Sequence, residues 1–361
     1  MHQGVINVPD WGGPAFADNS VRLDGRRADA ALAGLRRLQF ADLKDYKSCI
    51  SAAGQMGFGY YFPYLLCRDA EEDCAVFLGE DEGSVCVFLR RYRTSRPHLD
   101  VLLAPAPMNT RVLRRCLERA NDHNGDLSAT VMKIDEKDVD QLSDLRTLRV
   151  KKRKEQYLYS PRSFIDIRGN RFRTLRRNVA MAEALPNLEV LPFTSEHARG
   201  CLRLLRRWRR RHRYDNGHAA RTAARLIGLG DALPDLDLRG EVIYVDGRLS
   251  AFSFGGELRP GLGCFVEAKS NLRIPGLSYF QRLHFLRGLS EFELVNDGPD
   301  AGRAGLKQLK DSFRPVKMHI EYRAYQQPGL LRRVLKRGTH YGKEAIVKIL
   351  SRKAPPAPPN T

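Results

Sequence analysis

Short apolar segments bounded by turn residues alternate with segments of helical periodicity along the first half of the chain. Runs rich in Val, Leu, Phe and Tyr favour β-strands. They span residues 60–67, 75–79, 85–90, 99–103 and 129–134. Apolar positions three and four residues apart predict helices over residues 42–53, 109–121 and 137–145, the second of them capped by Asn109. The first half is therefore expected to combine a sheet with helices.

The same kinds of segment recur in the second half. Strands are predicted at residues 164–167, 188–191, 241–245, 249–254, 263–267, 292–296 and 317–325. Asp246-Gly247 is expected to join the third and fourth of these strands in a hairpin. Helices are predicted at residues 172–185, 196–212, 222–229, 275–289 and 305–313. The repeated order predicts an α/β (α+β) protein with two similar halves, each a central mixed sheet flanked by helices.

A basic stretch separates the two halves. Residues 146–154 contain six Lys or Arg residues and no acid, and we interpret them as the crossing between two domains. The expected organisation is an N-terminal arm at 1–38, a first domain at 39–150 and a second domain at 151–326. A basic helix within 330–350 and a Pro-rich tail are expected in the last segment, 327–361.

The charge balance indicates an anionic partner. The chain has 361 residues, and 61 Lys and Arg against 42 Asp and Glu give a net charge of +19. Such an excess favours nucleic acid, an anionic membrane surface or a phosphorylated co-substrate, although a solvated basic surface is the simpler alternative. No apolar run approaches the ~20 residues of a membrane span. No secretion signal is apparent, and the seven scattered cysteines favour a reducing, cytoplasmic location.

Arginine is concentrated on the predicted helix at 196–212. An apolar stripe contains Cys201, Leu204, Leu205 and Trp208. The remaining faces carry Arg203, Arg206, Arg207, Arg209, Arg210 and Arg211, with Arg213 just beyond. A helix with so unbalanced an outer face would attract phosphates, either of a tRNA acceptor stem or of anionic lipid headgroups. We assign these six arginines to tRNA binding.

A possible phosphate-binding turn follows the strand at 263–267. Arg273-Ile274-Pro275-Gly276-Leu277-Ser278 lies between this strand and a helix, and it resembles the acyl-CoA loop of GNAT N-acyltransferases. In such a loop, backbone N–H groups at the helix N-terminus bind a pyrophosphate, and glycine permits close approach. The alternative is an ordinary strand-to-helix turn with Pro275 at the first helical position.

The sharpest family resemblance comes near the end of the chain. A strand ends in Asn296-Asp297-Gly298, and a short helix then carries Lys310-x-x-Phe313-x-Pro315. This pattern resembles the C-terminal catalytic domain of phosphatidylglycerol lysyltransferases and their soluble relatives. It is similar, more distantly, to the Fem-type peptidoglycan aminoacyltransferases.

The resemblance implies two GNAT-like domains in tandem, the second of them catalytic, and an aminoacyl-tRNA donor. Arg176-Arg177-Asn178 looks like the helix that opens the second domain in this family. The donor-binding residues that we expect on this basis are Arg176, Arg177, Asn178, Gly276, Asn296, Asp297, Asp300 and Phe313. Glu267 and Arg273 loosely represent an acidic-then-arginine signature of the lipid enzymes.

Aminoacyl transfer requires few groups, because the aminoacyl ester is already activated. Lys310 and Arg273 are candidates for stabilising the negative charge of the tetrahedral intermediate. Glu267 is a candidate for accepting the acceptor's proton. The alternatives are a helix-end cation for Lys310 and a strand-end ion-pair partner for Glu267. The nine histidines show no metal-ligand spacing, and no Gly-x-Ser-x-Gly, P-loop or His-Glu-x-x-His motif is present, so neither a metal nor a bound cofactor is expected.

Three functions remain open from the sequence. The first is an aminoacyltransferase that uses aminoacyl-tRNA and an amine or hydroxyl acceptor. The second is a GNAT N-acyltransferase that uses acyl-CoA or a carrier-protein thioester. The third is a non-enzymatic module that binds RNA or an anionic membrane surface. The sequence does not identify the acceptor.

Overall fold

A computed structural model of the protein describes residues 32–69, 73–92, 97–142, 145, 147–211 and 218–327. The predicted helix within 330–350, the tail, Arg213 and most of the N-terminal arm lie outside these residues. All elements named below belong to the described part of the chain.

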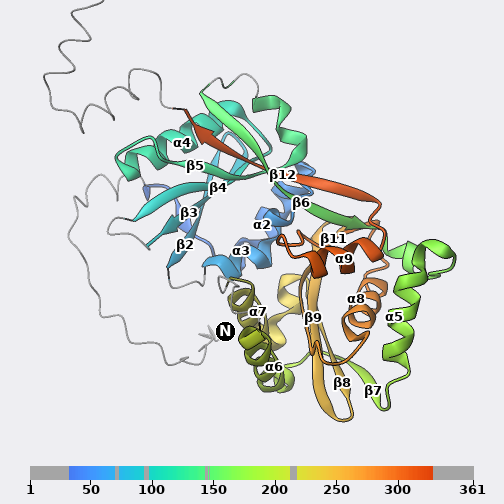
Figure 1. Ribbon diagram of the computed structural model, residues 1–361. Coiled ribbons are helices and arrows are strands. Elements are labelled where there is room, and N and C mark those ends of the chain that lie inside the picture. Colours follow the sequence, from blue (N-terminus) through green and yellow to red (C-terminus); the bar gives the residue numbers. More distant parts are fainter. Residues whose placement is uncertain are drawn as a thin grey trace, which may run out of the picture.

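Twelve strands of the described residues form one mixed sheet, in the order β1-β2-β3-β4-β5-β12-β6-β11-β10-β9-β8-β7 (Figure 1). The strands of the first half are β1 (Arg36–Arg37), β2 (Cys74–Asp81), β3 (Ser84–Arg91), β4 (His98–Ala106) and β5 (Thr130–Ile134). Those of the second half are β7 (Leu188–Pro192), β8 (Leu238–Val245), β9 (Arg248–Arg259), β10 (Leu262–Ser270) and β11 (Leu294–Asn296). The central pair is β6 (Leu148–Tyr159) and β12 (Lys317–Gln326).

The two halves have the same arrangement of strands on either side of this central pair. In each half, several antiparallel strands are followed by a helix and then by one strand that pairs parallel with the last of them. The parallel pairs are β4 with β5 in the first half and β10 with β11 in the second. Helix α4 (Thr110–Asn124) connects the first parallel pair, and α8 (Leu277–Arg287) connects the second. Strand β12 pairs antiparallel with both β5 and β6, while β6 also pairs with β11. The predicted α/β fold with helices on a mixed sheet is confirmed, and the two predicted sheets are joined edge to edge into one.

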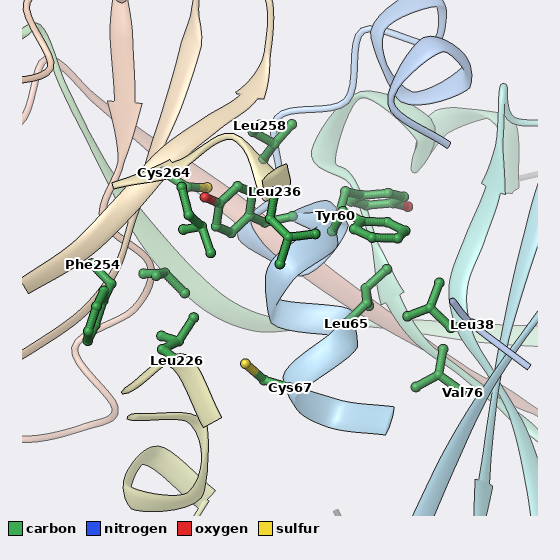
Figure 2. Close-up of a cluster of buried hydrophobic side chains, with 14 of the residues drawn as sticks. Leu38, Tyr60, Leu65, Cys67, Val76, Leu226, Leu236, Phe254, Leu258 and Cys264 are labelled. Atoms are coloured by element: carbon green, nitrogen blue, oxygen red, sulfur yellow. The ribbon is translucent and has the colours of Figure 1, made fainter. Parts of the chain in front are cut away.

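Helices cover both faces of the sheet. Helices α2 (Leu43–Ala52), α3 (Phe62–Asp69), α6 (Ala198–Arg211) and α7 (His218–Leu229) pack on a core that both halves share. In this core, Leu65 and Cys67 of α3 lie between Val76 of the first half and Leu226 and Phe254 of the second (Figure 2). Separate clusters lie under α4, and under α5 (Arg173–Glu183), α8 and α9 (Ala304–Ser312). Because the first core spans both halves, α3 ties them together.

Several local predictions are wrong. Residues 60–67 form a 3₁₀ turn and helix α3, with Pro63 in its first turn, instead of a strand. A short apolar run that is buried on all sides does not distinguish a helix from a strand by its periodicity. Residues 137–145 contain two 3₁₀ turns, Glu136–Asp138 and Asp140–Leu142, where a helix was expected. The strand predicted at 164–167 is absent from the described residues there, which follow the 3₁₀ turn Pro161–Phe164.

Most of the basic stretch belongs to β6, which lies at the centre of the sheet between the strands of the two halves. The backbone of β6 forms hydrogen bonds with β12. Most of its cationic side chains are exposed to solvent, and Arg153 forms an ion pair with Glu321 of β12. The exposed side chains of this strand thus account for the run of cations in the sequence.

Candidate active site

The loop that follows β11 is held by buried polar contacts from three elements. Lys310 of α9 is buried, and its ammonium donates to the carbonyl oxygens of Asp297 at 2.5 Å, Gly298 at 3.0 Å and Pro299 at 3.1 Å. The carboxylate of Asp297 pairs with the buried Arg282 of α8 and lies 3.5 Å from the Lys310 ammonium. The three N–H donors of Lys310 are therefore directed at the backbone of this loop.

Asn296 connects the same loop to the first half of the protein. Its side-chain amide donates to the carbonyl of Met56 and to Gln156 Oε1 of β6, both at 2.8 Å, and its Oδ1 accepts from the N–H of Gly298. Gln156 in turn accepts from the N–H of Phe58 at 2.8 Å. Asp300 accepts from the Tyr157 hydroxyl at 3.1 Å. The predicted residues Asn296, Asp297, Asp300 and Lys310 thus form one cluster.

Burial alters the acid–base behaviour of Lys310. Desolvation lowers the pKa of its ammonium to about 8, although the nearby Asp297 carboxylate acts in the opposite direction. An ordinary lysine has a pKa of 10.5. Lys310 is therefore partly deprotonated at mildly alkaline pH in the folded protein.

A second cluster lies where β10 extends beyond the end of β11. The parallel pairing stops at Cys264 and Asn296, and a β-bulge interrupts β10 between Phe265 and Glu267. Beyond the bulge, Glu267 forms a largely buried ion pair with Lys269. The end of β10 thus carries a carboxylate and an ammonium that are paired with each other and that face a helix.

That helix is α6, whose Trp208 covers the pair. The Lys269 ammonium lies 4.4 Å from the Trp208 ring centroid, within cation–π range. The Arg303 guanidinium, at the N-terminal end of α9, lies 5.6 Å from the same ring. Trp208 therefore brings together α6, β10 and the segment that follows the Asp297–Pro299 loop.

The remaining surface of α6 is basic, as the sequence predicted. Cys201, Leu204 and Leu205 are buried against the shared core. The exposed residues include all six predicted arginines, Arg203, Arg206, Arg207, Arg209, Arg210 and Arg211. The same helix thus carries an arginine surface outside and Trp208 against the Glu267–Lys269 pair.

The Arg273–Ser278 turn has a packing role. Gly276 begins α8 at a φ of 77°, and a Cβ built on it would lie 2.1 Å from the Asn178 carbonyl oxygen of α5. Gly276 therefore allows the start of α8 to pack closely against helix α5. Arg273 is exposed, and it is not part of either cluster described above.

The other predicted donor-binding residues also make contacts within the fold. Arg176 donates to the carbonyls of Ile167 and Gly169, and Asn178 donates to Thr174 of its own helix. Arg177 is exposed. Phe313 is fully buried among aromatic rings that include Tyr159 and Phe164. The structure does not bring these residues to the Glu267–Lys269 pair.

Several residues of the two clusters, among them Lys269, Trp208, Arg282 and Arg303, were missed as chemistry-bearing groups in the sequence. Lys269 lies two positions after Glu267 on one strand, so alternation would have paired them, but the strand was expected to end at 267. Trp208 was assigned only to an apolar stripe. Arg282 lies inside a helix of mixed pattern, and nothing in its spacing points to Asp297.

Other binding features are few in the described residues. A shallow groove of about 530 Å³ between α2 and the start and end of the β8–β9 hairpin is lined by Phe40, Lys44, Lys47, Asp237 and Glu257, among others, and includes no predicted site residue. Over the part of the chain that the structure describes, no three His, Cys, Asp or Glu side chains could hold a metal ion together. None of the described helices is long and apolar enough to cross a membrane.

The Gly276 contact gives a test with a matched control. We expect Gly276→Ala to destabilise the fold by about 2–4 kcal/mol, from positive-φ strain and the clash with α5. Gly302→Ala is the control, because Gly302 has a φ of 71° with no atom within 4 Å of its added Cβ, and it should cost only about 1 kcal/mol. Urea unfolding measures both. Equal losses would contradict the packing role of Gly276.

The lowered pKa of Lys310 predicts a pH-dependent stability difference. Between pH 8 and 10.5 the unfolded chain retains a proton that the folded chain releases, so unfolding becomes harder as pH rises. Relative to Lys310→Met, the wild type should gain roughly 2 kcal/mol of unfolding free energy between pH 7 and 9.5. Lys317→Met, at an exposed lysine of β12, should show a constant difference. A constant difference for Lys310→Met as well would rule out the coupling.

Comparisons with known proteins place this arrangement in a family. The family model described as phosphatidylglycerol lysyltransferase, C-terminal, matches residues 57–325. No curated protein matches the sequence significantly.

Several solved structures share the fold. A conserved protein of unknown function from Bacteroides thetaiotaomicron has a TM-score of 0.69 at 17% identity, covering 81% of this chain and 99% of that chain. L-PGS from Bacillus licheniformis has a TM-score of 0.54 at 16% identity, covering 81% and 94%. FemX has a TM-score of 0.56 at 9% identity, covering 83% and 99%. The family match spans most of the chain, and the protein therefore belongs to the phosphatidylglycerol lysyltransferase C-terminal family, a family of transferases.

Proposed function

We propose that this protein transfers an aminoacyl group from aminoacyl-tRNA to an amine or hydroxyl acceptor. The observation that carries the proposal is the position of α6. One side of this helix sets Trp208 against the Glu267–Lys269 pair, and its other sides expose the arginines. A tRNA whose acceptor stem lay along these arginines would have its aminoacyl end near the carboxylate.

The proposed chemistry uses side chains of this chain alone. The acceptor's amine or hydroxyl attacks the ester carbonyl, and Glu267 takes the proton that the acceptor loses. Lys269 and Arg303 stabilise the negative charge that develops on the carbonyl oxygen. The ester bond to the terminal ribose of the tRNA then breaks, and the leaving ribose oxygen receives the proton that Glu267 took from the acceptor. The family is named for the transfer of a lysyl group to phosphatidylglycerol. Our proposal takes from this name only the type of reaction, aminoacyl transfer.

Lys310 and Arg282 have a positioning role in this scheme. Together they hold the Asp297–Pro299 loop, and Arg303 follows shortly after that loop and reaches Trp208. The acyl-CoA alternative requires open space at Gly276, and α5 fills that space. Aminoacyl-tRNA is therefore the donor that the geometry supports better.

The role of Glu267 can be tested by single-turnover transfer from charged total tRNA, followed by mass spectrometry. Glu267→Gln should lower the transfer rate by ~10²-fold or more, the usual contribution of a general base. Glu257→Gln is the matched control, since Glu257 also pairs with a lysine, Lys47 at 3.3 Å, but lies in a different part of the molecule. It should transfer at the wild-type rate. A fully active Glu267→Gln protein would remove Glu267 from the mechanism.

The role of α6 can be tested by the salt dependence of tRNA binding. Arg207→Ala with Arg210→Ala should weaken binding and lower the log–log salt slope by about 0.7–0.9 for each lost phosphate contact. Arg111→Ala with Arg114→Ala is the control, because these two exposed arginines have the same spacing on α4. If both double variants bind tRNA with the same affinity and slope, α6 does not bind the RNA.

A further inference from the structure

The segment that joins α2 to α3, residues 55–58, lies between a carboxylate of the first half and the loop after β11. The N–H groups of Met56 and Gly57 both donate to Asp135 Oδ2 at 2.8 Å. The carbonyl oxygen of Met56 accepts from the side-chain amide of Asn296, also at 2.8 Å. This connecting segment is therefore bound on one side by the first half and on the other by the residue that ends β11.

Asp135 is fixed in place where β5 ends. It directly follows that strand and is 1% exposed. Its Oδ1 accepts from the N–H of Lys137 at 3.4 Å, and the Nε2 atom of His319 in β12 lies 3.6 Å from its Oδ2. Hydrogen bonds to an ionised acceptor are stronger than those to a neutral one. The two bonds from the connecting segment thus hold it firmly against the end of β5.

Asn296 is connected to the segment by more than one contact. Its amide donates to Gln156 as well as to Met56, and Gln156 accepts in addition from the N–H of Phe58. The Oδ1 atom of Asn296 accepts from the N–H of Gly298 at 2.8 Å. A Cβ added to Gly298 would lie 3.2 Å from a ring carbon of Phe58. Two hydrogen-bonded paths and one ring contact therefore connect the segment to the loop after β11.

The same loop leads to the proposed site. Lys310 binds its carbonyl oxygens, and Arg303 follows it with a guanidinium 5.6 Å from the Trp208 ring centroid. The ring also lies against Lys269, which pairs with Glu267. A displacement at the start of this loop would therefore move a segment that ends at the site.

We propose that Asp135 is a positioning residue for the transfer reaction. Through the connecting segment and Asn296 it fixes the loop after β11, and through that loop it fixes Arg303. Because Asp135 is buried in the first half, it acts without touching the reacting atoms. The effect on transfer rests on the proposed aminoacyltransferase function, whereas the coupling of Asp135 to the loop can be measured without turnover.

Amide hydrogen exchange of the full chain, read by proteolysis and mass spectrometry, tests the coupling. Asp135→Ala should speed exchange in peptides that cover residues 296–303 by roughly threefold to thirtyfold. Asp100→Ala is the matched control, because Asp100 is also buried and accepts the N–H of Thr130 at 2.9 Å, at the opposite end of β5. It should leave these peptides unchanged. No increase in Asp135→Ala, or an equal increase in both variants, would overturn the proposal.

A milder variant covers the case in which Asp135→Ala does not fold, which thermal unfolding shows. Asp135→Asn keeps an acceptor oxygen of the same shape but loses the charge, so it should speed exchange in the same peptides by a smaller factor. Asp100→Asn is then the control and should have no effect there. Equal exchange in these two proteins would overturn the coupling as well.

Transfer kinetics separate positioning from general destabilisation. Asp135→Ala should lower the single-turnover rate about tenfold or more at saturating aminoacyl-tRNA, since small displacements of a positioned group slow a reaction strongly. The affinity for tRNA should stay at the wild-type value, because α6 is unchanged. Asp100→Ala should retain both the rate and the affinity. A full transfer rate in folded Asp135→Ala would overturn the positioning role.

A double-mutant cycle tests the path through Asn296. If Asp135 acts through this residue, adding Asp135→Ala to Asn296→Ala should lower the rate little further. Two losses that multiply would show that Asp135 acts independently of Asn296, and would overturn the path. A wild type that transfers no aminoacyl group would contradict the proposed function, while faster exchange in residues 296–303 of Asp135→Ala would still support the coupling.

Discussion

The antiparallel pairing of β12 with β6 is the contact on which the rest of the molecule depends. Its register runs from Lys317 opposite Leu158 to Gln326 opposite Leu148. One side of this pair supports the first half through β5, and the other supports the second half through β11. Gln156 of β6 binds the loop after β11, and Glu321 of β12 pairs with Arg153 of β6. Both contacts would be lost if this register shifted, since a one-residue slip reverses every side chain.

The sequence correctly predicted those elements whose hydrophobic periodicity extends over many residues. Helices α4 and α6 show a long amphipathic pattern, and the β8–β9 hairpin has an Asp-Gly turn, so these elements appear where they were expected. The strand predicted at residues 60–67 was wrong because most of this segment is buried and its apolar residues run together without a clear period. The pairing of β12 with β5 could not be predicted either, because it depends on contacts nearly 200 residues apart along the chain.

The candidate site was predictable in its residue types more than in its contacts. Glu267 was identified, but its partner Lys269 was not, because the strand continues past a bulge that the pattern does not reveal. Lys310 and Gly276 were identified from motifs. Their roles depend on which carbonyl oxygens lie within reach, and those oxygens belong to residues 297–299 and to Asn178. Backbone groups are the same at every position, so the sequence cannot indicate which of them a lysine or a glycine will meet.

The central position of β12 has a consequence for how the chain folds during synthesis. Strand β5 is complete at Ile134, but its second neighbour in the sheet begins only at Lys317. Until that strand emerges from the ribosome, one edge of β5 presents unpaired backbone groups, which is the kind of surface that recruits foreign strands. At ~5–20 residues per second, the interval lasts on the order of ten seconds or more. The first half is thus translated early, but its part of the sheet is completed only when β12 is available.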